Sequence, residues 1–304
     1  MNLATEQPHQ TGDHTMIDVA SGNTERFNQT LCLYEDWINQ KVAGGYTRHP
    51  DGYLIFLTPA QTAGLDEYAN GDPFGFDVDS AFQHARISKT LSLISCGLEA
   101  NMSEDTCILD VGCGQGHITK RIAESFPGVN VFGVDTSINA IKHAQAHLSS
   151  GNLSYLVADA YLLPFRRDTI DIIVMNNIWE HVFNPVMLAR EARRVLRPGG
   201  LLIVSTPSRY RLSMLLKVIR GKQISISPHH ITEYTVGQMF ELLSFAGFEN
   251  VVPYRAYYME KVKIWAIRKR LFFAVRKILD FSLRMMHSHH ILSNTAFYTA
   301  NKPK

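Results

Sequence analysis

Short apolar runs alternate with amphipathic stretches through the middle of this chain. Runs rich in Val, Ile and Leu are typical of strands buried on both faces, and apolar residues at every third or fourth position are typical of the helices that cover them. Helices are predicted at 80–97 and 235–246, and strands at 107–110, 131–135, 153–160, 170–176 and 201–206. The alternation predicts an α/β fold with a doubly wound, mostly parallel sheet.

The first 78 residues do not follow this alternation. Residues 1–25 are polar and are expected to be a disordered leader. Helical spacing of apolar residues predicts a helix from about Arg26 to Val42, and the turn residues at 49–52 predict a hairpin. A helix followed by a hairpin resembles part of a winged-helix element, so 26–78 is expected to be a small α+β unit that forms a lid or a homodimer contact.

Composition excludes several classes of protein. The chain has 304 residues and 45% hydrophobic residues, which suits one full domain plus a smaller addition. Its four cysteines have no paired spacing, so neither a disulfide framework nor a zinc site is predicted. The first 25 residues lack the apolar segment of a signal peptide, and no run is long enough to span a bilayer. A cytoplasmic protein is the expectation.

The net charge of +2 conceals an uneven distribution. Residues 255–284 contain nine Lys or Arg and two Asp or Glu, and residues 209–222 contain five basic residues and no acidic one. Trp265, Phe272 and Leu279 recur every seven residues and would share one face of a helix. Two interpretations stay open: peripheral membrane contact through 209–222 and 258–286, or a helix whose apolar face packs on the domain.

Three glycines at alternate positions follow the strand that ends at Asp110. Glycine adopts backbone conformations that other residues avoid, and it lets a ligand lie against the main chain. The pattern is Gly112-x-Gly114-x-Gly116, and His117 occupies the position where a dinucleotide fingerprint has its third glycine. The Gly-Lys-Ser/Thr of a P-loop is also absent. The sequence therefore predicts a small-molecule site at the carboxyl end of the sheet.

Polar residues end the next three strands in the same way, at Asp135, Asp159 and Asn176, and an Arg-Pro-Gly-Gly turn ends at Gly200. In this order, the features across 107–206 resemble the class I S-adenosylmethionine-dependent methyltransferases of small-molecule type. The resemblance implies a Rossmann-like seven-stranded sheet in a domain at 79–255, with an insertion at 208–228 and a basic helical extension at 256–304.

The resemblance also implies which residues meet the cofactor S-adenosylmethionine. The glycine loop would contact it directly, a carboxylate after the second strand would accept the ribose hydroxyls, and the acid after the third strand and its neighbour would meet the adenine. The candidate cofactor-binding residues are Asp110, Gly112, Cys113, Gly114, Gly116, Asp135, Thr136, Asp159, Ala160 and Asn176.

Two segments carry candidate catalytic residues. Residues 176–181 resemble the Glu-x-x-Glu-His segment of quinone-biosynthesis O-methyltransferases, which can hold a divalent metal, but Asn177 replaces the first Glu and no metal is predicted. Glu180 and His181 either act there or merely pin the local helix. In 227–234, a histidine could act as the general base for a hydroxyl group, or it could have only a structural role. Thr232 or Thr235 is expected to cap the helix that follows this segment. The candidates are His229, His230, His181 and Glu180.

The function expected from these features is O-methylation of a small, lipophilic metabolite. Methylation of a sugar or a protein is the alternative within the family, and a non-catalytic, cofactor-binding regulatory protein is the alternative outside it. Nucleic acid is not an expected partner, because residues 26–43 carry only Arg26 and Lys41 as basic residues, and no Asn/Asp-Pro-Pro-Tyr/Phe motif follows the fourth strand.

Overall fold

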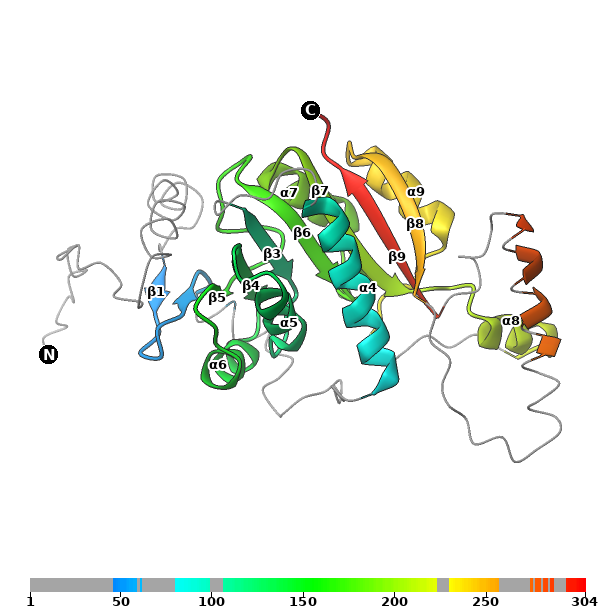
Figure 1. Cartoon of the computed structure of the whole chain (residues 1–304), viewed down its shortest axis with the longest axis horizontal. Coiled ribbons are helices and arrows are strands. Elements are labelled where there is room, and N and C mark those ends of the chain that lie inside the picture. Colours follow the sequence, from blue (N-terminus) through cyan, green and yellow to red (C-terminus); the bar gives the residue numbers. More distant parts are fainter. Residues whose placement is uncertain are drawn as a thin grey trace, which may run out of the picture.

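The computed structural model describes the central part of the chain and its C-terminus (Figure 1). The leader predicted at 1–25 and the helix predicted at 26–42 lie outside the described residues. The described residues are 46–58, 61, 80–98, 106–222, 230–256, 274–275, 277–279, 281–283, 285–286 and 294–304.

The described strands form one sheet in the order β1-β2-β5-β4-β3-β6-β7-β9-β8. Strands β3 to β7 are parallel to one another, and β9 is antiparallel to both of its neighbours. The predicted seven-stranded Rossmann-like sheet is confirmed as β3 to β9. The strands are β1 (Thr47–Arg48), β2 (Leu54–Ile55), β3 (Cys107–Val111), β4 (Asn130–Asp135), β5 (Leu153–Val157), β6 (Ile170–Asn176), β7 (Leu196–Pro207), β8 (Glu249–Ala256) and β9 (Thr295–Asn301).

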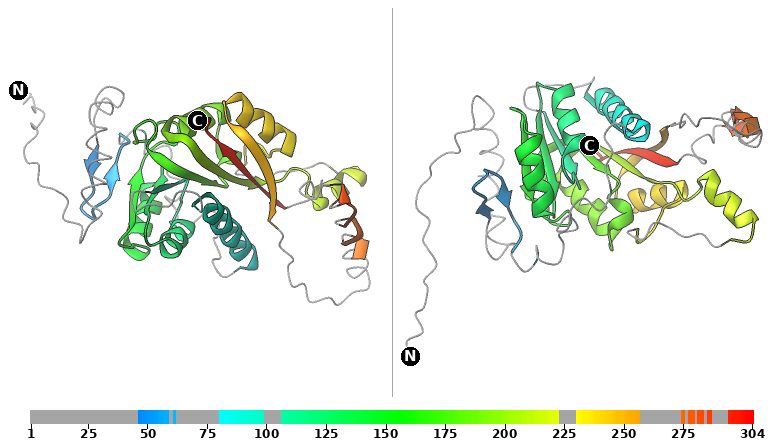
Figure 2. Two further views of the ribbon diagram at one scale, coloured as in Figure 1. Left: turned by 45° about the horizontal axis from the view of Figure 1, so that its top comes forward. Right: turned by 90° about the horizontal axis from the view of Figure 1, so that it is seen from below.

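Helices cover both faces of the sheet, so that its strands are buried from two sides (Figures 1 and 2). Ile108 of β3 packs in one hydrophobic cluster with the residues of α4 and α5, and the next residue, Leu109, packs in the other with those of α7 and α9. The helices are α4 (Ala81–Leu98), α5 (His117–Ser125), α6 (Ile138–His147), α7 (Pro185–Val195), α8 (Leu212–Ile219) and α9 (Val236–Phe245), with a 3-10 turn, η1, at Trp179–His181.

The predicted hairpin is present and extends the main sheet. β1 and β2 pair antiparallel, and Leu54 of β2 pairs with Leu156 of β5 in parallel register. The amide of Phe56 donates to the carbonyl of Val157 at 2.8 Å, and Tyr53 and Leu54 are buried. The hairpin therefore covers the edge of β5 that would otherwise present unpaired backbone groups. The division of the chain at residue 78 stays a prediction.

The prediction that all of 256–304 is a helical extension outside the domain is wrong, because its last part belongs to the sheet. Residues 295–301 form β9, which pairs with β7 on one side and with β8 on the other. Ala296, Phe297 and Tyr298 are buried there. The domain therefore includes the C-terminus, and residues 257–294 are an insertion between β8 and β9. Among the described helices, none combines the length and apolar character that crossing a bilayer requires.

Candidate active site

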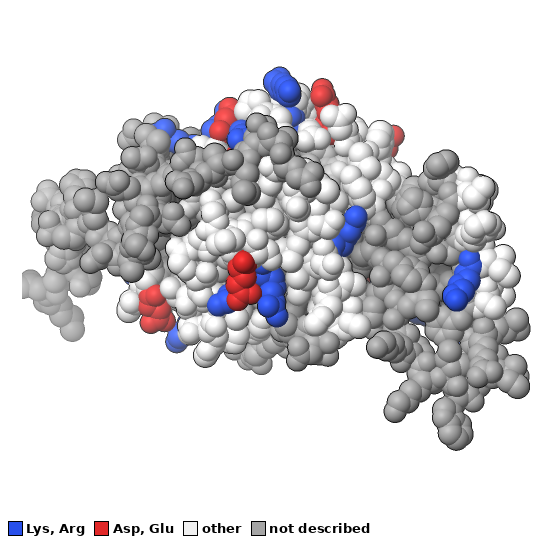
Figure 3. All heavy atoms as spheres, viewed as in Figure 1, with Lys and Arg blue, Asp and Glu red and all other residues white. Residues whose placement is uncertain are grey.

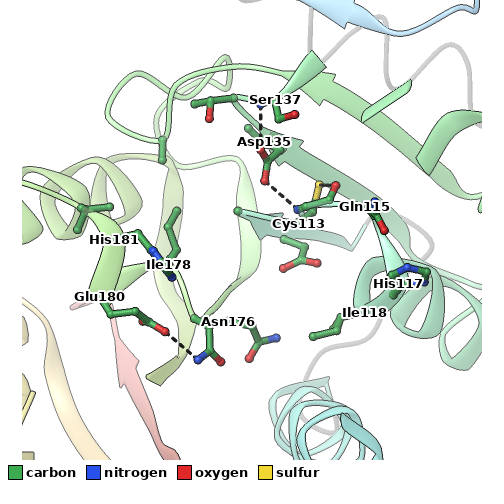
Figure 4. Close-up of a pocket in the computed structure, with 18 of the residues that line it drawn as sticks. Cys113, Gln115, His117, Ile118, Asp135, Ser137, Asn176, Ile178, Glu180 and His181 are labelled. Atoms are coloured by element: carbon green, nitrogen blue, oxygen red, sulfur yellow. Dashed lines mark hydrogen bonds between the residues drawn. The ribbon is translucent and has the colours of Figure 1, made fainter. Parts of the chain in front are cut away.

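A cavity of about 650 Å³ opens at the carboxyl ends of the parallel strands (Figure 4). This is where ligands bind in open α/β sheets, and the volume is within the range of small-molecule sites. Nine of the ten candidate cofactor-binding residues line it, and these nine come from the ends of four strands. They are Asp110, Gly112, Cys113, Gly114, Asp135, Thr136, Asp159, Ala160 and Asn176.

Gly116, the tenth candidate, does not line this cavity. It precedes α5 in a left-handed conformation (φ +82°), and a Cβ there would lie 2.5 Å from the hydroxyl oxygen of Tyr155 and 2.9 Å from the Cβ of Ala144. This glycine therefore lets the loop rest on β5 and α6, and its contact with the cofactor stays a prediction. Gly112 and Gly114 also have positive φ, and both remain on the cavity wall.

Asp135 ties the glycine loop to the end of β4. Its Oδ2 accepts from the amide of Gly114 at 2.8 Å, and its Oδ1 accepts from the amide of Ser137 at 2.9 Å (Figure 4). Each carboxylate oxygen has two lone pairs, so both can also accept from a ligand hydroxyl. The residue predicted to hold the ribose is thus oriented by two backbone amides.

Asp110 is almost completely buried at the end of β3. Thr119 donates to its Oδ2 at 2.7 Å, but burial outweighs this bond and raises the pKa of the Asp110 carboxyl to about 7. The same surroundings act on Cys113, whose pKa burial and the nearby Asp135 raise well above its usual value. Cys113 therefore remains a thiol, in line with a small residue beside a ligand rather than a nucleophile.

Arg86 lies on the cavity wall and was not predicted from the sequence. It comes from α4 and is only 8% exposed. Burial lowers the pKa of its guanidinium to about 10, while the charges of Glu180 and Asp110 oppose this shift. The sequence signal was a basic residue on the otherwise apolar face of a helix leading into the sheet. Arg86 gives the cavity wall a positive charge that interacts with the carboxylates of Glu180 and Asp110.

The side of the cavity opposite the glycine loop is formed by the segment after β6. Asn177 has a left-handed backbone (φ +56°), and its amide group donates to Oε1 of Glu180 at 2.8 Å. Thr206 of β7 donates to Oε2 of Glu180 at 3.1 Å. Glu180 is completely buried, and burial raises the pKa of its carboxyl. Its side chain is therefore fixed by neighbours at both oxygens.

The fold brings the two predicted catalytic segments together. The carbonyl of Glu180 accepts from the amide of Ile231 at 2.7 Å, and the rings of His181 and His230 meet edge to face at a centroid distance of 5.1 Å. Glu180, His181 and His230 all line the cavity. His229 lies outside the described residues, so its place in the site stays a prediction.

A buried carboxylate orients His230. Nδ1 of His230 lies 3.2 Å from Oε1 of Glu233. Nη2 of Arg211 donates to both carboxylate oxygens of Glu233 at 2.7 Å. The side chain of Glu233 is 1% exposed. Glu233 lies in the predicted segment 227–234, but its role could not be predicted because its partner Arg211 lies in the preceding insertion. Arg211, Glu233 and His230 thus form a chain of contacts that ends at the cavity wall.

Glu180, His181 and His230 also have the side-chain types that bind divalent metals. One ligand atom from each residue lies within 4.8 Å of the others. Both oxygens of Glu180 already accept hydrogen bonds, and Nδ1 of His230 faces Glu233. The three side chains could converge on a cation with the lone pairs that remain.

Comparison with known proteins adds to this geometry. A family model described as a methyltransferase domain matches residues 109–204. A probable S-adenosylmethionine-dependent methyltransferase of Mycolicibacterium smegmatis is 31% identical over 147 residues, which are 47% of this chain and 51% of that protein. The malonyl-[acyl-carrier protein] O-methyltransferase of Hahella chejuensis is 38% identical over 109 residues, which are 35% of this chain and 39% of that protein. The chain thus spans about half, or less, of these relatives' length.

Solved structures agree at the level of the fold. The CurJ carbon methyltransferase superposes with a TM-score of 0.51 at 18% identity, covering 74% of this chain and 56% of that one. The matched residues 109–204 run from β3 to β7 and contain the glycine loop, Asp135 and the segment after β6. On this sequence match and this strand order, residues 109–204 lie in a methyltransferase domain of the class I S-adenosylmethionine-dependent type.

Proposed function

We propose that this protein transfers a methyl group from S-adenosylmethionine to a hydroxyl group of a small, lipophilic metabolite. The observation that carries the proposal is a histidine on the cavity wall, His230, that a buried and charge-paired carboxylate orients. A histidine held in this way suits the removal of a proton from a hydroxyl nucleophile.

The cavity fits the cofactor at several points. The glycine loop has no side chain at Gly112 and Gly114, and both have positive φ, so a ligand can lie against the main chain. The amide Nδ2 of Asn176 is buried at the cavity and has no hydrogen-bond partner among the described residues, which leaves a donor for a ligand's acceptor. Asp110 and Asp135 offer carboxylates to a cationic ligand with ribose hydroxyls.

S-adenosylmethionine supplies, when bound, a methyl group on a sulfonium centre that is a good leaving group. The tasks left to the protein are to orient the acceptor, to exclude water and to take up its proton. When Nδ1 of His230 donates to Glu233, Nε2 is the nitrogen left to accept a proton. Arg211 neutralises Glu233 and holds it in place, which fixes the plane of the imidazole.

The rim of the cavity supports a lipophilic acceptor. Phe183 lines the cavity although its side chain is 89% exposed, and Ile178, Val182 and Tyr161 line the same side. A large apolar side chain in water beside a polar cavity is typical of a surface that a ligand covers. An acceptor with an apolar body and one hydroxyl group could contact these apolar side chains and also reach His230.

The test is transfer of a labelled methyl group to a panel of phenols and alcohols with increasing apolar size. His230→Gln should lower kcat by about 10²- to 10⁴-fold, the range of general base catalysis, while the Kd for S-adenosylmethionine changes less than about twofold. His147→Gln, on the exposed side of α6, is the matched control and should behave as wild type. Full activity of the His230 variant, or methylation at carbon or nitrogen alone, would contradict the proposal.

A further inference from the structure

We propose that two insertions at one edge of the sheet form a docking surface for anionic lipid membranes. We call it the docking edge and define it by the end of α8 with the residues after it, 217–222, and by the helical residues between 274 and 286. The proposal concerns binding alone, so it stands or falls separately from the methyl acceptor proposed above.

Both insertions leave the sheet on the side where the cavity opens. α8 follows the carboxyl end of β7, and residues 257–294 join the carboxyl end of β8 to the start of β9. β7 and β8 are each antiparallel to β9, so their carboxyl ends lie at the same edge of the sheet as those of β3 to β6. Figures 1 and 2 show α8 and the helical residues near 280 beyond this end of the sheet.

The described helical residues between 274 and 286 turn large apolar side chains to solvent. Ile278, Phe281 and Met285 are 67%, 67% and 70% exposed, whereas Leu279 and Leu283 are only partly exposed. At 100° per residue, these three side chains lie within about 60° of one another on a helix, and with Val275 and Met286, which are 54% and 62% exposed, they span about 140° of its surface. This exposure is opposite to what a helix packing its apolar face on the domain would show.

The end of α8 also has exposed apolar residues, and exposed basic residues follow them. Val218 and Ile219 are 50% and 71% exposed, and they are followed by the exposed basic residues Arg220 and Lys222. Exposed apolar residues gathered on both segments exceed the isolated ones that any surface carries. An apolar surface flanked by Lys and Arg is the pattern of segments that lie in a membrane interface.

Charge decides between a lipid surface and a second copy of the chain as the occupant. Residues 209–222 contain five basic residues and no acidic one, and 255–284 contain nine basic and two acidic residues. A symmetric dimer through this surface would bring like charges together, whereas anionic headgroups would complement them. On the face shown in Figure 3, the visible described residues at this end include Lys or Arg atoms and no Asp or Glu atoms.

Flotation of the full-length protein with vesicles tests the proposal. Wild type should float with vesicles containing about 30% phosphatidylglycerol and stay behind with neutral phosphatidylcholine, and salt near 0.5 M should reduce recovery because it screens the attraction. Changing the basic residues of the docking edge to Gln should weaken partitioning by about tenfold or more. These residues are Lys217, Arg220, Lys222 and Lys277.

Matched variants distinguish binding through the docking edge from an effect of the protein's overall charge. Changing four exposed basic residues elsewhere, Arg48, Arg121, Lys142 and Arg167, to Gln should leave flotation unchanged. The apolar triple variant Ile278→Ser, Phe281→Ser and Met285→Ser should lose binding while keeping wild-type affinity for S-adenosylmethionine, which shows that the domain is folded. Equal recovery with both vesicle types, none with either, or equal losses in the control set would overturn the proposal. So would a wild-type dimer that the triple variant converts to a monomer.

Discussion

The affinity for S-adenosylmethionine should rise as the pH is raised from 5 to 7, because Asp110 must be ionised to attract a cationic ligand. Burial raises the pKa of Asp110 to about 7 in the ligand-free protein. A sulfonium and an ammonium group entering the cavity would favour the carboxylate and move its pKa back toward the ordinary value. Binding would then release a proton at pH 5 to 7.

The size of the effect follows from the fraction of Asp110 that is ionised. With a pKa of about 7, roughly 1% of the molecules carry the carboxylate at pH 5 and about half do at pH 7. If only the ionised form binds well, Kd should fall by about 50-fold over this interval. The interval ends below the range in which a free α-amino group titrates, so the ligand's own charge stays nearly constant.

Titration calorimetry at half-unit steps of pH, in buffers with different ionisation enthalpies, measures both Kd and the protons released. Asp110→Asn is the control, since it keeps the shape and can still accept from Thr119. Its affinity should be independent of pH over the same interval. A wild-type change smaller than about threefold, or the same slope in the Asn variant, would refute the reasoning.

The same pKa has a consequence for the stability of the ligand-free protein. A carboxyl with a raised pKa binds more protons in the folded than in the unfolded state between pH 4 and pH 7. Its contribution to the free energy of unfolding is therefore fully present below pH 4 and is lost as the pH rises through about 7. At about 1.4 kcal/mol per pKa unit, the loss is at most about 4 kcal/mol. Chemical denaturation should show a smaller loss in Asp110→Asn than in wild type, because only the contribution of Glu180, whose pKa burial also raises, then remains.

Three further outcomes are expected. Asp135→Ala should weaken S-adenosylmethionine binding by about 2–4 kcal/mol in calorimetry, because it removes the predicted ribose acceptor and the tie to the glycine loop; wild-type affinity would contradict the assignment. Glu233→Gln should lower kcat by about 100-fold and alter its pH profile without changing cofactor affinity, because an amide donating to Nδ1 leaves the proton of His230 on the wrong nitrogen; an unchanged profile would make Glu233 merely structural. EDTA should leave activity intact, because Asn177 replaces a carboxylate and the proton transfer proposed for His230 needs no metal; a loss restored by a divalent cation would instead make Glu180 a metal ligand.

The parts of the fold that follow from local pattern could be predicted. The strand ending at Asp110, its glycine loop and the helix after it appear where their composition places them. Thr235 caps α9 in a reciprocal arrangement with Gln238, as one of the two threonines was expected to do. These signals lie within a few residues of the structure they determine, so no distant contact had to be known.

What the sequence left hidden depends on distant partners. β9 is a short strand after a long basic insertion, and its identity becomes plain only from its pairing with β7 and β8. In the sequence, Arg86 is only a basic residue that interrupts the apolar face of a helix. Its role becomes visible from its interactions with Asp110 of β3 and Glu180 after β6. Glu233 gains its role from Arg211 in another insertion. Each case needs tertiary placement that composition and periodicity do not encode.

The register of the last two strands makes one insertion a detachable module. Ala256 at the end of β8 pairs directly with Thr295 at the start of β9, so the residues between them leave and rejoin the sheet at adjacent backbone positions. Opposite residues in an antiparallel ladder lie about 5 Å apart, a gap that a two-residue turn can close. Residues 257–294 could therefore be excised and replaced by Asn-Gly without altering the register of the sheet. The same junction would accept a segment from a relative, so chimeric chains could exchange this insertion and keep the rest of the sheet unchanged.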